Sequence, residues 1–368
     1  MRFLIVARNE AVGVQATWLV PPAPAHHFDF VIRIPDGDVR PGLINAHDHL
    51  HRNHYGRLGA PPYANAYEWG RDIHARDAET ISAAQRLPRS LALRVGAWKN
   101  LFAGVTTVVH HDAWEAEFNP DFPIRVVRVR CAHSLGFERS STVWQKVDEP
   151  FAVHIAEGID TAAAEEVREL DRRGLVDSRL LAVHAVGVDD DGIARLRGAG
   201  AAVVWCPTSN LFLFGRTAPP SLLASGIDLL LGSDSLLSGT GTLLDELRVA
   251  RSLGIISDER LADAVGEVAA RRLGISEPTL EAGAVADLVV LRRPLLEATT
   301  DDVAAVIVGG VPRVLDPALA SSLSPVLPDG EFMTRDGVTR WVLTGPLELH
   351  RRPAYAVTHD GRPHRGRA

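Results

Sequence analysis

Short apolar runs alternate with longer amphipathic segments through most of this chain. Runs of the length of buried β-strands occur at 41–50, 105–109, 124–131, 151–155, 180–183, 201–205 and 227–231. Apolar residues at three- or four-residue spacing predict helices over 78–103, 161–173, 190–197 and 243–250. Strands that alternate with helices indicate parallel βα units. Six or more such units in succession favour a closed (β/α)8-type TIM barrel over an open sheet.

The pattern changes at both ends of the chain. Residues 1–40 contain short strand-like pieces broken by proline and glycine turns, which predict antiparallel strands. Residues 275–352 contain further strands with turn residues between them, and residues 332–343 are expected to form a hairpin around Asp336-Gly337. We therefore expect an α/β protein in which residues 41–274 form the barrel and the two end segments together form a small β-sandwich. Residues 353–368 are polar and are expected to form a flexible tail.

Composition narrows the class of protein. The 368 residues are 46% hydrophobic and 23% charged, as in a soluble globular protein. A formal net charge of −7 without a basic stripe argues against a nucleic-acid partner. No apolar run approaches the roughly 18 residues that a membrane helix needs, and the N-terminus lacks the apolar core of a secretory signal. Cys131 and Cys206 are too few for a disulfide framework, so we expect a cytoplasmic protein with no membrane partner.

Histidine and aspartate residues stand at the ends of four of the apolar runs. His47 and His49 close the first run, and side chains two residues apart on a strand leave the same face. His154, His184 and Asp234 follow three later runs. One such residue alone is more often a core side chain, but the carboxyl ends of barrel strands open onto one mouth. Three imidazoles and a carboxylate suit Zn²⁺, Fe²⁺ or another borderline cation, so the pattern predicts a metal site.

These segments, taken in order, resemble the amidohydrolase superfamily, specifically its mononuclear-metal branch of cytosine deaminases, guanine deaminases and triazine (chloro)hydrolases. The matching segments are Pro41-Gly-Leu-Ile-Asn-Ala-His47-Asp-His49, Gly104-Val-Thr-Thr-Val-Val109, His154-Ile-Ala-Glu157, Val183-His184-Ala-Val186, Trp205-Cys-Pro-Thr-Ser-Asn210, Leu231-Gly-Ser-Asp234-Ser235 and Gly283-Ala-Val-Ala-Asp287-Leu-Val-Val-Leu291. They lie within residues 41–310, and their order is far more specific than His-x-His alone.

The resemblance implies one divalent metal ion, with zinc the first expectation and iron or manganese the alternatives. The implied metal ligands are His47, His49, His154 and Asp234. It also implies that Asp234 takes a proton from the bound water, that His184 orients the nucleophile and that Glu157 protonates a ring nitrogen of the substrate. The strand expected at 125–133 carries no bridging Lys or Glu, and Lys146 lies outside it, which favours a single ion.

These roles predict an aminohydrolase that deaminates a small nitrogen heterocycle by attack of metal-bound hydroxide. Two alternatives stay open. One is a hydrolase of the same family with a ring amide or a halide as leaving group, and the other is a catalytically degenerate binding scaffold. Signatures of other hydrolases, such as H-E-x-x-H and G-x-S-x-G, do not occur. A small heterocyclic substrate is the expected partner, and a homodimer is left open.

One part of the chain departs from the family pattern. Only residues 112–123 separate the second predicted strand from the one at 125–133, where a helix, a strand and another helix are usual. We therefore expect an irregular barrel around strands 3–4, with the loops at 51–74 and 112–123 forming the pocket wall. The candidate substrate-binding residues are Arg57, Trp69, His110, His133 and Asn210. For the crowded histidines nearby, loop or supporting roles are favoured over a second metal; these are His51, His54, His110 and His111.

Overall fold

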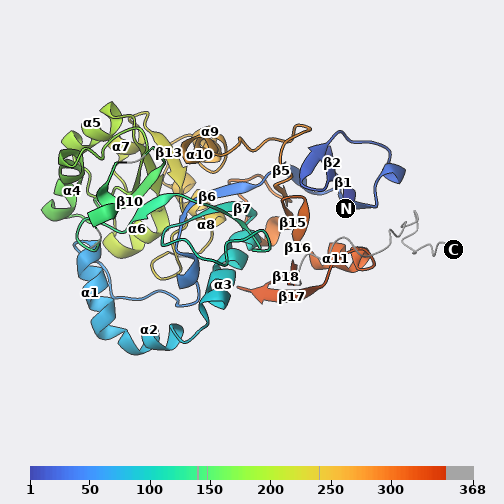
Figure 1. The fold of residues 1–368 in the computed structure, drawn as a ribbon, viewed down its shortest axis with the longest axis horizontal. Coiled ribbons are helices and arrows are strands. Elements are labelled where there is room, and N and C mark those ends of the chain that lie inside the picture. Colours follow the sequence, from blue (N-terminus) through green and yellow to red (C-terminus); the bar gives the residue numbers. More distant parts are fainter. Residues whose placement is uncertain (139–140, 147, 240, 345–368) are drawn as a thin grey trace.

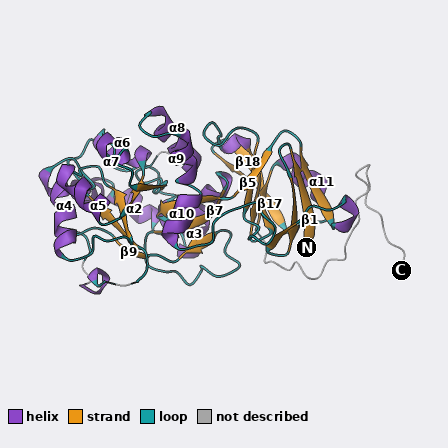
Figure 2. Ribbon diagram, turned by 90° about the horizontal axis from the view of Figure 1, so that it is seen from above, coloured by secondary structure: helices purple, strands orange, loops and turns teal. Residues whose placement is uncertain are grey.

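Parallel strands and helices fill one half of the molecule, and strands from both ends of the chain fill the other (Figures 1 and 2). The computed structural model describes residues 1–138, 141–146, 148–239 and 241–344. The tail predicted at 353–368 lies outside the described residues, as does the end of the segment predicted at 275–352. No described helix is both long enough and apolar enough to cross a membrane.

Two sheets make up the half that contains both ends of the chain. The first has the order β3-β2-β1-β4 and consists of β1 (Arg2–Ala7), β2 (Ala11–Gln15), β3 (Trp18–Val20) and β4 (Phe30–Ile34). The second has the order β17-β18-β16-β15-β14-β5 and consists of β5 (Asp38–Pro41), β14 (Leu288–Leu291), β15 (Val303–Val308), β16 (Val311–Leu315), β17 (Gly330–Arg335) and β18 (Val338–Leu343). The β17–β18 hairpin turns at Asp336-Gly337, as the sequence predicts. The pairing of β1 with β4 is parallel, where the sequence predicts only antiparallel strands, because the chain crosses back through 21–29 before β4 begins.

The two end segments of the chain are joined by backbone pairing and by a shared core. β5 pairs antiparallel with β14, so the strand just before the first histidine run is fixed to the C-terminal segment. Phe3 and Ile5 of the first sheet lie in one apolar cluster with Leu288, Ile307 and Trp341 of the second. Burial of large apolar side chains of this kind stabilises by about 1.5–3 kcal/mol each. The shared core therefore holds the start of β6 in place.

The other half contains two parallel sheets whose strands follow one another in sequence order. One has the order β6-β7-β8 and consists of β6 (Leu43–Asp48), β7 (Val105–His110) and β8 (Arg125–Val127). The other runs from β9 to β13 and consists of β9 (Arg130–Ala132), β10 (Phe151–Ile155), β11 (Leu180–His184), β12 (Ala202–Trp205) and β13 (Asp228–Leu231). The expected α/β fold with parallel strands is confirmed. All the carboxyl ends in each sheet consequently lie at one edge.

The segment 125–132 links the two parallel sheets. Its first half, β8, pairs with β7, and its second half, β9, pairs with β10. The sequence predicts one continuous strand at Ile124–Cys131, whereas the structure breaks it at Arg128-Val129. Between β7 and β10 the described residues form only these two short strands and a 3-10 turn at Ser141–Trp144. A single broken strand thus occupies the irregular region that the short connection at 112–123 indicates.

Helices surround the parallel strands. They are α1 (Ala66–Arg76), α2 (Ala78–Ala84), α3 (Arg89–Phe102), α4 (Thr161–Arg172), α5 (Asp190–Gly198), α6 (Pro207–Phe214), α7 (Pro220–Leu223), α8 (Leu243–Ser252), α9 (Asp258–Asp263) and α10 (Glu267–Leu273). The single helix predicted at 78–103 is wrong: it is divided between α2 and α3 at Pro88, which cannot donate a helical hydrogen bond. α1 is an additional helix inside the segment predicted to be a loop.

Candidate metal centre and its pocket

The first two histidines of the site lie at the carboxyl end of β6. The strand is buried along its whole length, and His47 is its last residue but one. His49 follows one residue after the strand, and its ring lies 5.1 Å from the ring of His47. His49 Nδ1 lies 2.7 Å from a carboxylate oxygen of Asp112, a contact that fixes the ring and directs its Nε2 inward. Partners of this kind commonly orient metal-binding histidines.

His154 from β10 and Asp234 beyond β13 complete a cluster of four donor groups. His154 Nε2 lies 3.3 Å from His47 Nε2. Asp234 Oδ1 lies 3.7 Å from His47 Nε2 and 3.9 Å from His49 Nε2. Nitrogen ligands about 2.0–2.1 Å from a tetrahedral zinc ion stand about 3.3–3.4 Å apart. Three of the distances among these four side chains are thus near the spacing that one cation requires. Around His47, the described residues form two groups of possible cation ligands, His47 with His111 and His154, and His47 with His184 and Asp234.

Asp234 is held so that one oxygen faces the histidines. The hydroxyls of Ser209 and Ser238 donate to its Oδ2 at 2.8 and 2.7 Å, while Oδ1 faces the cluster and accepts the backbone N–H of Ser235. Burial raises the pKa of this carboxyl, but the neighbouring His47, His49 and His184 together outweigh burial and hold the pKa well below its usual range. Asp234 is consequently an ionised acceptor at the edge of the cluster.

Glu157 and His184 lie beside the four donors. His184 Nε2 is 3.6 Å from Glu157 Oε1, and His184 Nδ1 is 2.9 Å from Asn210 Oδ1. Because the amide oxygen can only accept, it fixes the proton on Nδ1 and leaves Nε2 free to face the site. Burial raises the pKa of Glu157 to about 7, although His184 opposes the shift. Glu157 can thus hold or release a proton near neutral pH.

Strained backbone marks the carboxyl ends of the strands that carry these groups. Ala156, His184 and Asp234 have φ angles of 51°, 72° and 50°, in the left-handed region that residues with a Cβ seldom occupy. Each such residue costs about 1–3 kcal/mol, and such strain clusters at active sites. The N–H of Ala156 is held by the buried Glu166 carboxylate at 2.7 Å. The surrounding contacts therefore keep Glu157 aimed at His184.

A buried ion pair lies next to the site and contacts the segments that carry its residues. Lys99 of α3 lies 3.0 Å from the Asp48 carboxylate and donates to Ser233 Oγ and to the backbone carbonyl of Asp234. Asn100, the next residue of α3, donates to the same Asp48 carboxylate at 2.7 Å. Sequence reasoning missed this group, although a lysine between Trp98 and Leu101 in an apolar helix is a signal that could have found it. The ion pair connects β6, α3 and the segment after β13.

Two further residues that sequence reasoning gave no part in the metal site lie against the histidines. Asp112 contacts His49 and also lies 3.4 Å from His133 Nε2. His111 donates from Nε2 to the Ala132 carbonyl, so its buried Nδ1 carries a lone pair, and that atom has no hydrogen-bond partner among the described residues. His111 stacks on the ring of His154 at 4.3 Å and belongs with it to a group of possible cation ligands.

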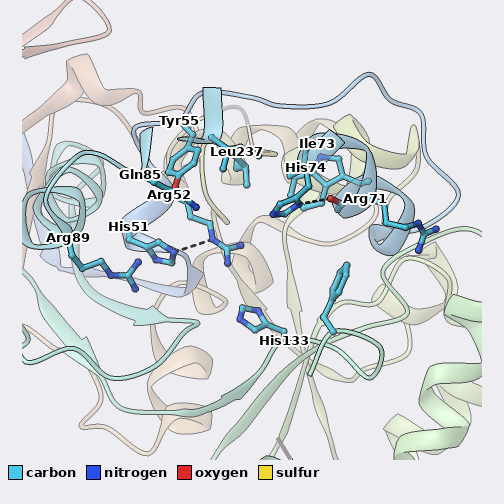
Figure 3. Close-up of a pocket in the computed structure, with 14 residues that line it drawn as sticks. His51, Arg52, Tyr55, Arg71, Ile73, His74, Gln85, Arg89, His133 and Leu237 are labelled. Carbon is cyan, nitrogen blue, oxygen red and sulfur yellow. Dashed lines mark hydrogen bonds between the residues drawn. The ribbon is translucent and has the colours of Figure 1, made fainter. Parts of the chain in front are cut away.

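The expected substrate-binding residues lie in different places. Trp69 and His133 line a pocket of about 600 Å³ beside the cluster, and Figure 3 shows His133 at its edge. His110 lines a second cavity, and its Nδ1 accepts the N–H of Leu50. Asn210 contacts His184, as described above. Arg57 does not line the pocket: its guanidinium stacks over the ring of Phe212 at 5.1 Å.

Sequence comparisons identify relatives of the chain. Residues 140–313 match the model of the amidohydrolase family. A 5-methylthioadenosine/S-adenosylhomocysteine deaminase of Pyrococcus furiosus is 29% identical over 206 residues, 50% of this chain and 48% of that protein. An aminodeoxyfutalosine deaminase of Deinococcus radiodurans is 44% identical over 89 residues, 24% of this chain and 21% of that protein. The chain therefore matches about half or less of the length of these relatives.

Solved structures share the fold at lower identity. An adenosine deaminase of Xanthomonas campestris with bound zinc has a TM-score of 0.63 at 20% identity, covering 88% of this chain and 97% of that one. An atrazine chlorohydrolase of Arthrobacter aurescens complexed with zinc has a TM-score of 0.67 at 16% identity, covering 89% and 100%. Residues 140–313 thus match the amidohydrolase family, and the chain is similar in sequence to curated deaminases and in fold to an adenosine deaminase and a triazine hydrolase.

Proposed function

We propose that this protein is a metal-dependent aminohydrolase that removes an amino group from a small nitrogen heterocycle. One observation carries the proposal: four cation-binding groups stand beside Glu157, a buried carboxyl group whose pKa of about 7 suits proton transfer at neutral pH. The similarity to curated deaminases points the same way.

We assign the cation to the three histidines and the aspartate of the cluster. The ligands are His47, His49, His154 and Asp234. When bound there, a divalent ion acts as a Lewis acid and lowers the pKa of a water molecule towards about 7. Zinc is the first expectation because two structures of the same fold contain it, and iron or manganese are the alternatives.

The remaining steps belong to side chains. Asp234 Oδ1 accepts a proton from the attacking water, and His184 Nε2 orients the water while Asn210 holds the ring. Protonated Glu157 donates to a ring nitrogen as the new C–O bond forms at the adjacent carbon. The C–N bond to the amino group then breaks as the amino group takes up the proton held by Asp234, and ammonia leaves. The new hydroxyl group becomes a carbonyl and gives its proton to Glu157, which restores the acid. Proton transfer of this kind contributes about 10²–10⁴ in rate.

A second reaction would use the same groups. The chain is also 29% identical to an S-triazine hydrolase of Gordonia rubripertincta over 188 residues, 45% of this chain and 42% of that protein. Attack of water on a heterocycle that carries another leaving group needs the same nucleophile and the same acid. Hydrolysis with release of a group other than ammonia is therefore the alternative function.

A substrate screen tests both reactions. Metal-replete protein is incubated with amino-purines, pterins, pyrimidines and triazines, and ammonia release and product mass are measured. Ammonia release that disappears in the Glu157→Gln variant supports the proposal. A product formed without ammonia supports the alternative. If the metal-replete protein converts no heterocycle in the panel, both are wrong and the binding-scaffold alternative gains support.

We also propose that the two parallel sheets form one irregular barrel over residues 41–274. The backbone N–H of Asp234 donates to the His47 carbonyl at 3.0 Å, so the segment after β13 returns to β6. Residues 1–40 and 275–352 would then form the accompanying β-sandwich around their shared core. A cytoplasmic location and a homodimer stay predictions.

A further inference from the structure

The pocket beside the cluster is cationic, although the chain as a whole is acidic. Its lining includes three arginines and three histidines and no aspartate or glutamate, against a net charge of −7 for the chain. The arginines are Arg52, Arg71 and Arg89, and the histidines are His51, His74 and His133. Burial lowers the pKa of His51 to about 2, so the positive charge of the lining belongs to the arginines. We propose that this pocket binds an anionic group, a carboxylate or a phosphate, carried by the substrate. The heterocyclic part of that substrate rests on the proposed function.

Arg52 is the residue that would hold the anion. Its Nε donates to His51 Nε2 at 3.3 Å, and its Nη2 lies 3.9 Å from Asp112 Oδ1, beyond hydrogen-bond distance. Asp112 is occupied by His49 and His133. Within the described part of the chain, the terminal nitrogens of Arg52 make no hydrogen bond and have one long ion-pair contact, with Asp112. Figure 3 shows the guanidinium reaching into the pocket above His133. Two parallel N–H groups of this kind match a carboxylate or phosphate.

The other two arginines contribute less. Arg89 is already paired with Glu115, to which its Nε donates at 2.8 Å. Arg71 is exposed and has no ion-pair partner in the ranges that the structure describes, and in Figure 3 its side chain is turned away from the centre of the pocket. The charges of Arg89 and Arg71 can attract an anion to the entrance of the pocket, but they do not fix its position. Replacement of Arg52 should consequently weaken binding of the anion more than replacement of Arg71 or Arg89.

The size and apolar surfaces of the pocket indicate a substituted heterocycle. The pocket measures about 600 Å³, larger than one small ring needs, and within the range of drug-sized ligand sites. Trp69 bonds its indole N–H to the Leu58 carbonyl, which leaves its ring as an apolar wall together with Ile73 and Leu237. Because His133 contacts Asp112, which contacts His49, the pocket adjoins the proposed metal ligands. A substrate could thus place its ring at the cluster and its anionic substituent at Arg52.

Binding measurements on matched pairs of probes test this inference. The zinc-loaded Glu157→Gln variant, which should not turn substrates over, is titrated calorimetrically with neutral and anionic nucleosides. The pairs are adenosine with adenosine 5′-carboxylic acid, adenosine with adenosine 5′-monophosphate, and cytidine with cytidine 5′-monophosphate. We expect at least one anionic probe to bind about 10- to 100-fold more tightly than its neutral partner. Whether the carboxylate probe or the phosphate probe binds more tightly shows which of the two anionic groups the pocket takes.

Charge-matched variants assign the effect to Arg52. In the Glu157→Gln background, the second substitution Arg52→Gln should remove most of the preference for the anionic probe and change the affinity for the neutral probe by less than about threefold. Arg52→Lys should retain part of the preference for the anionic probe. Arg293→Gln makes the same charge change at an exposed position next to β14 and should have no effect. Absence of binding by every anionic probe, no preference over the neutral partners, or an equal loss for both members of a pair would overturn the inference.

The inference and the proposed function can fail separately. Ammonia release from neutral heterocycles without any preference for anionic ones would contradict the anion site and leave the aminohydrolase intact. Anion binding that depends on Arg52, in a protein that converts no heterocycle, would contradict the aminohydrolase and leave the anion site intact.

Discussion

Asn210 Oδ1 lies 2.9 Å from His184 Nδ1 and thereby fixes which nitrogen of His184 faces Glu157. We expect Asn210→Leu to lower kcat about 10- to 100-fold, the range for groups that orient active-site ligands, because Nε2 would carry a proton in part of the population. Asn210→Asp keeps the acceptor and should retain more activity. Bound metal, measured by elemental analysis, should stay unchanged in both variants, which separates this positioning role from general damage. Equal activity of the Leu variant and the parent protein would contradict the assignment.

The metal should be required and bound at about one ion per chain. Dialysis against a chelator should abolish turnover, and added zinc should restore it. His154→Ala should lower bound zinc, because one of the two nitrogens 3.3 Å apart is lost. Asp234→Asn should abolish turnover with the fold largely intact, since a neutral amide cannot accept the proton of the attacking water. Full zinc content in the His154 variant, or activity in the Asp234 variant, would show that the ligand set is wrong.

The rate should fall as pH rises through about 7. Glu157 acts in its protonated form, and burial raises its pKa from 4.5 to about 7, so the acid is available below that pH and is lost above it. We therefore expect kcat/KM to show a descending limb with an apparent pKa near 7. In Glu157→Gln the residual rate should be low, and that limb should disappear. A descending limb that survives in the variant would mean that another group titrates.

The positions of the proposed metal ligands could be predicted because they follow simple rules of strand geometry. His47, His49, His154 and Asp234 each follow an apolar run, and parallel strands bring such positions to one edge. The structure places them together as that rule requires. The position of Glu157 follows from the same rule, because this residue lies two residues beyond the carboxyl end of β10.

Residues on loops could not be placed by the same rules. Asp112 lies in the short connection after β7, where no periodicity reports the direction of a side chain. Arg57 was expected to contact substrate, but the loop turns it onto Phe212. Pro88 differs, because its missing N–H was visible in the sequence and already marked the boundary between α2 and α3. Arg52, by contrast, became a candidate only when the folded pocket showed that no carboxylate lines it.

The buried Lys99–Asp48 pair should be a major stability element. The two groups are fully buried and 3.0 Å apart, so removing the lysine leaves an uncompensated carboxylate next to the site. We expect Lys99→Met to lower the free energy of unfolding by about 3–5 kcal/mol, measured by urea denaturation of the zinc-loaded protein. The double variant Lys99→Met with Asp48→Asn should be less destabilised than Lys99→Met alone, because the carboxylate charge is removed and the amide oxygen can still accept from Asn100. If the single variant loses less than about 1 kcal/mol, or if the double variant is the less stable of the two, the pair is not what holds α3 against β6 and the segment that carries Asp234.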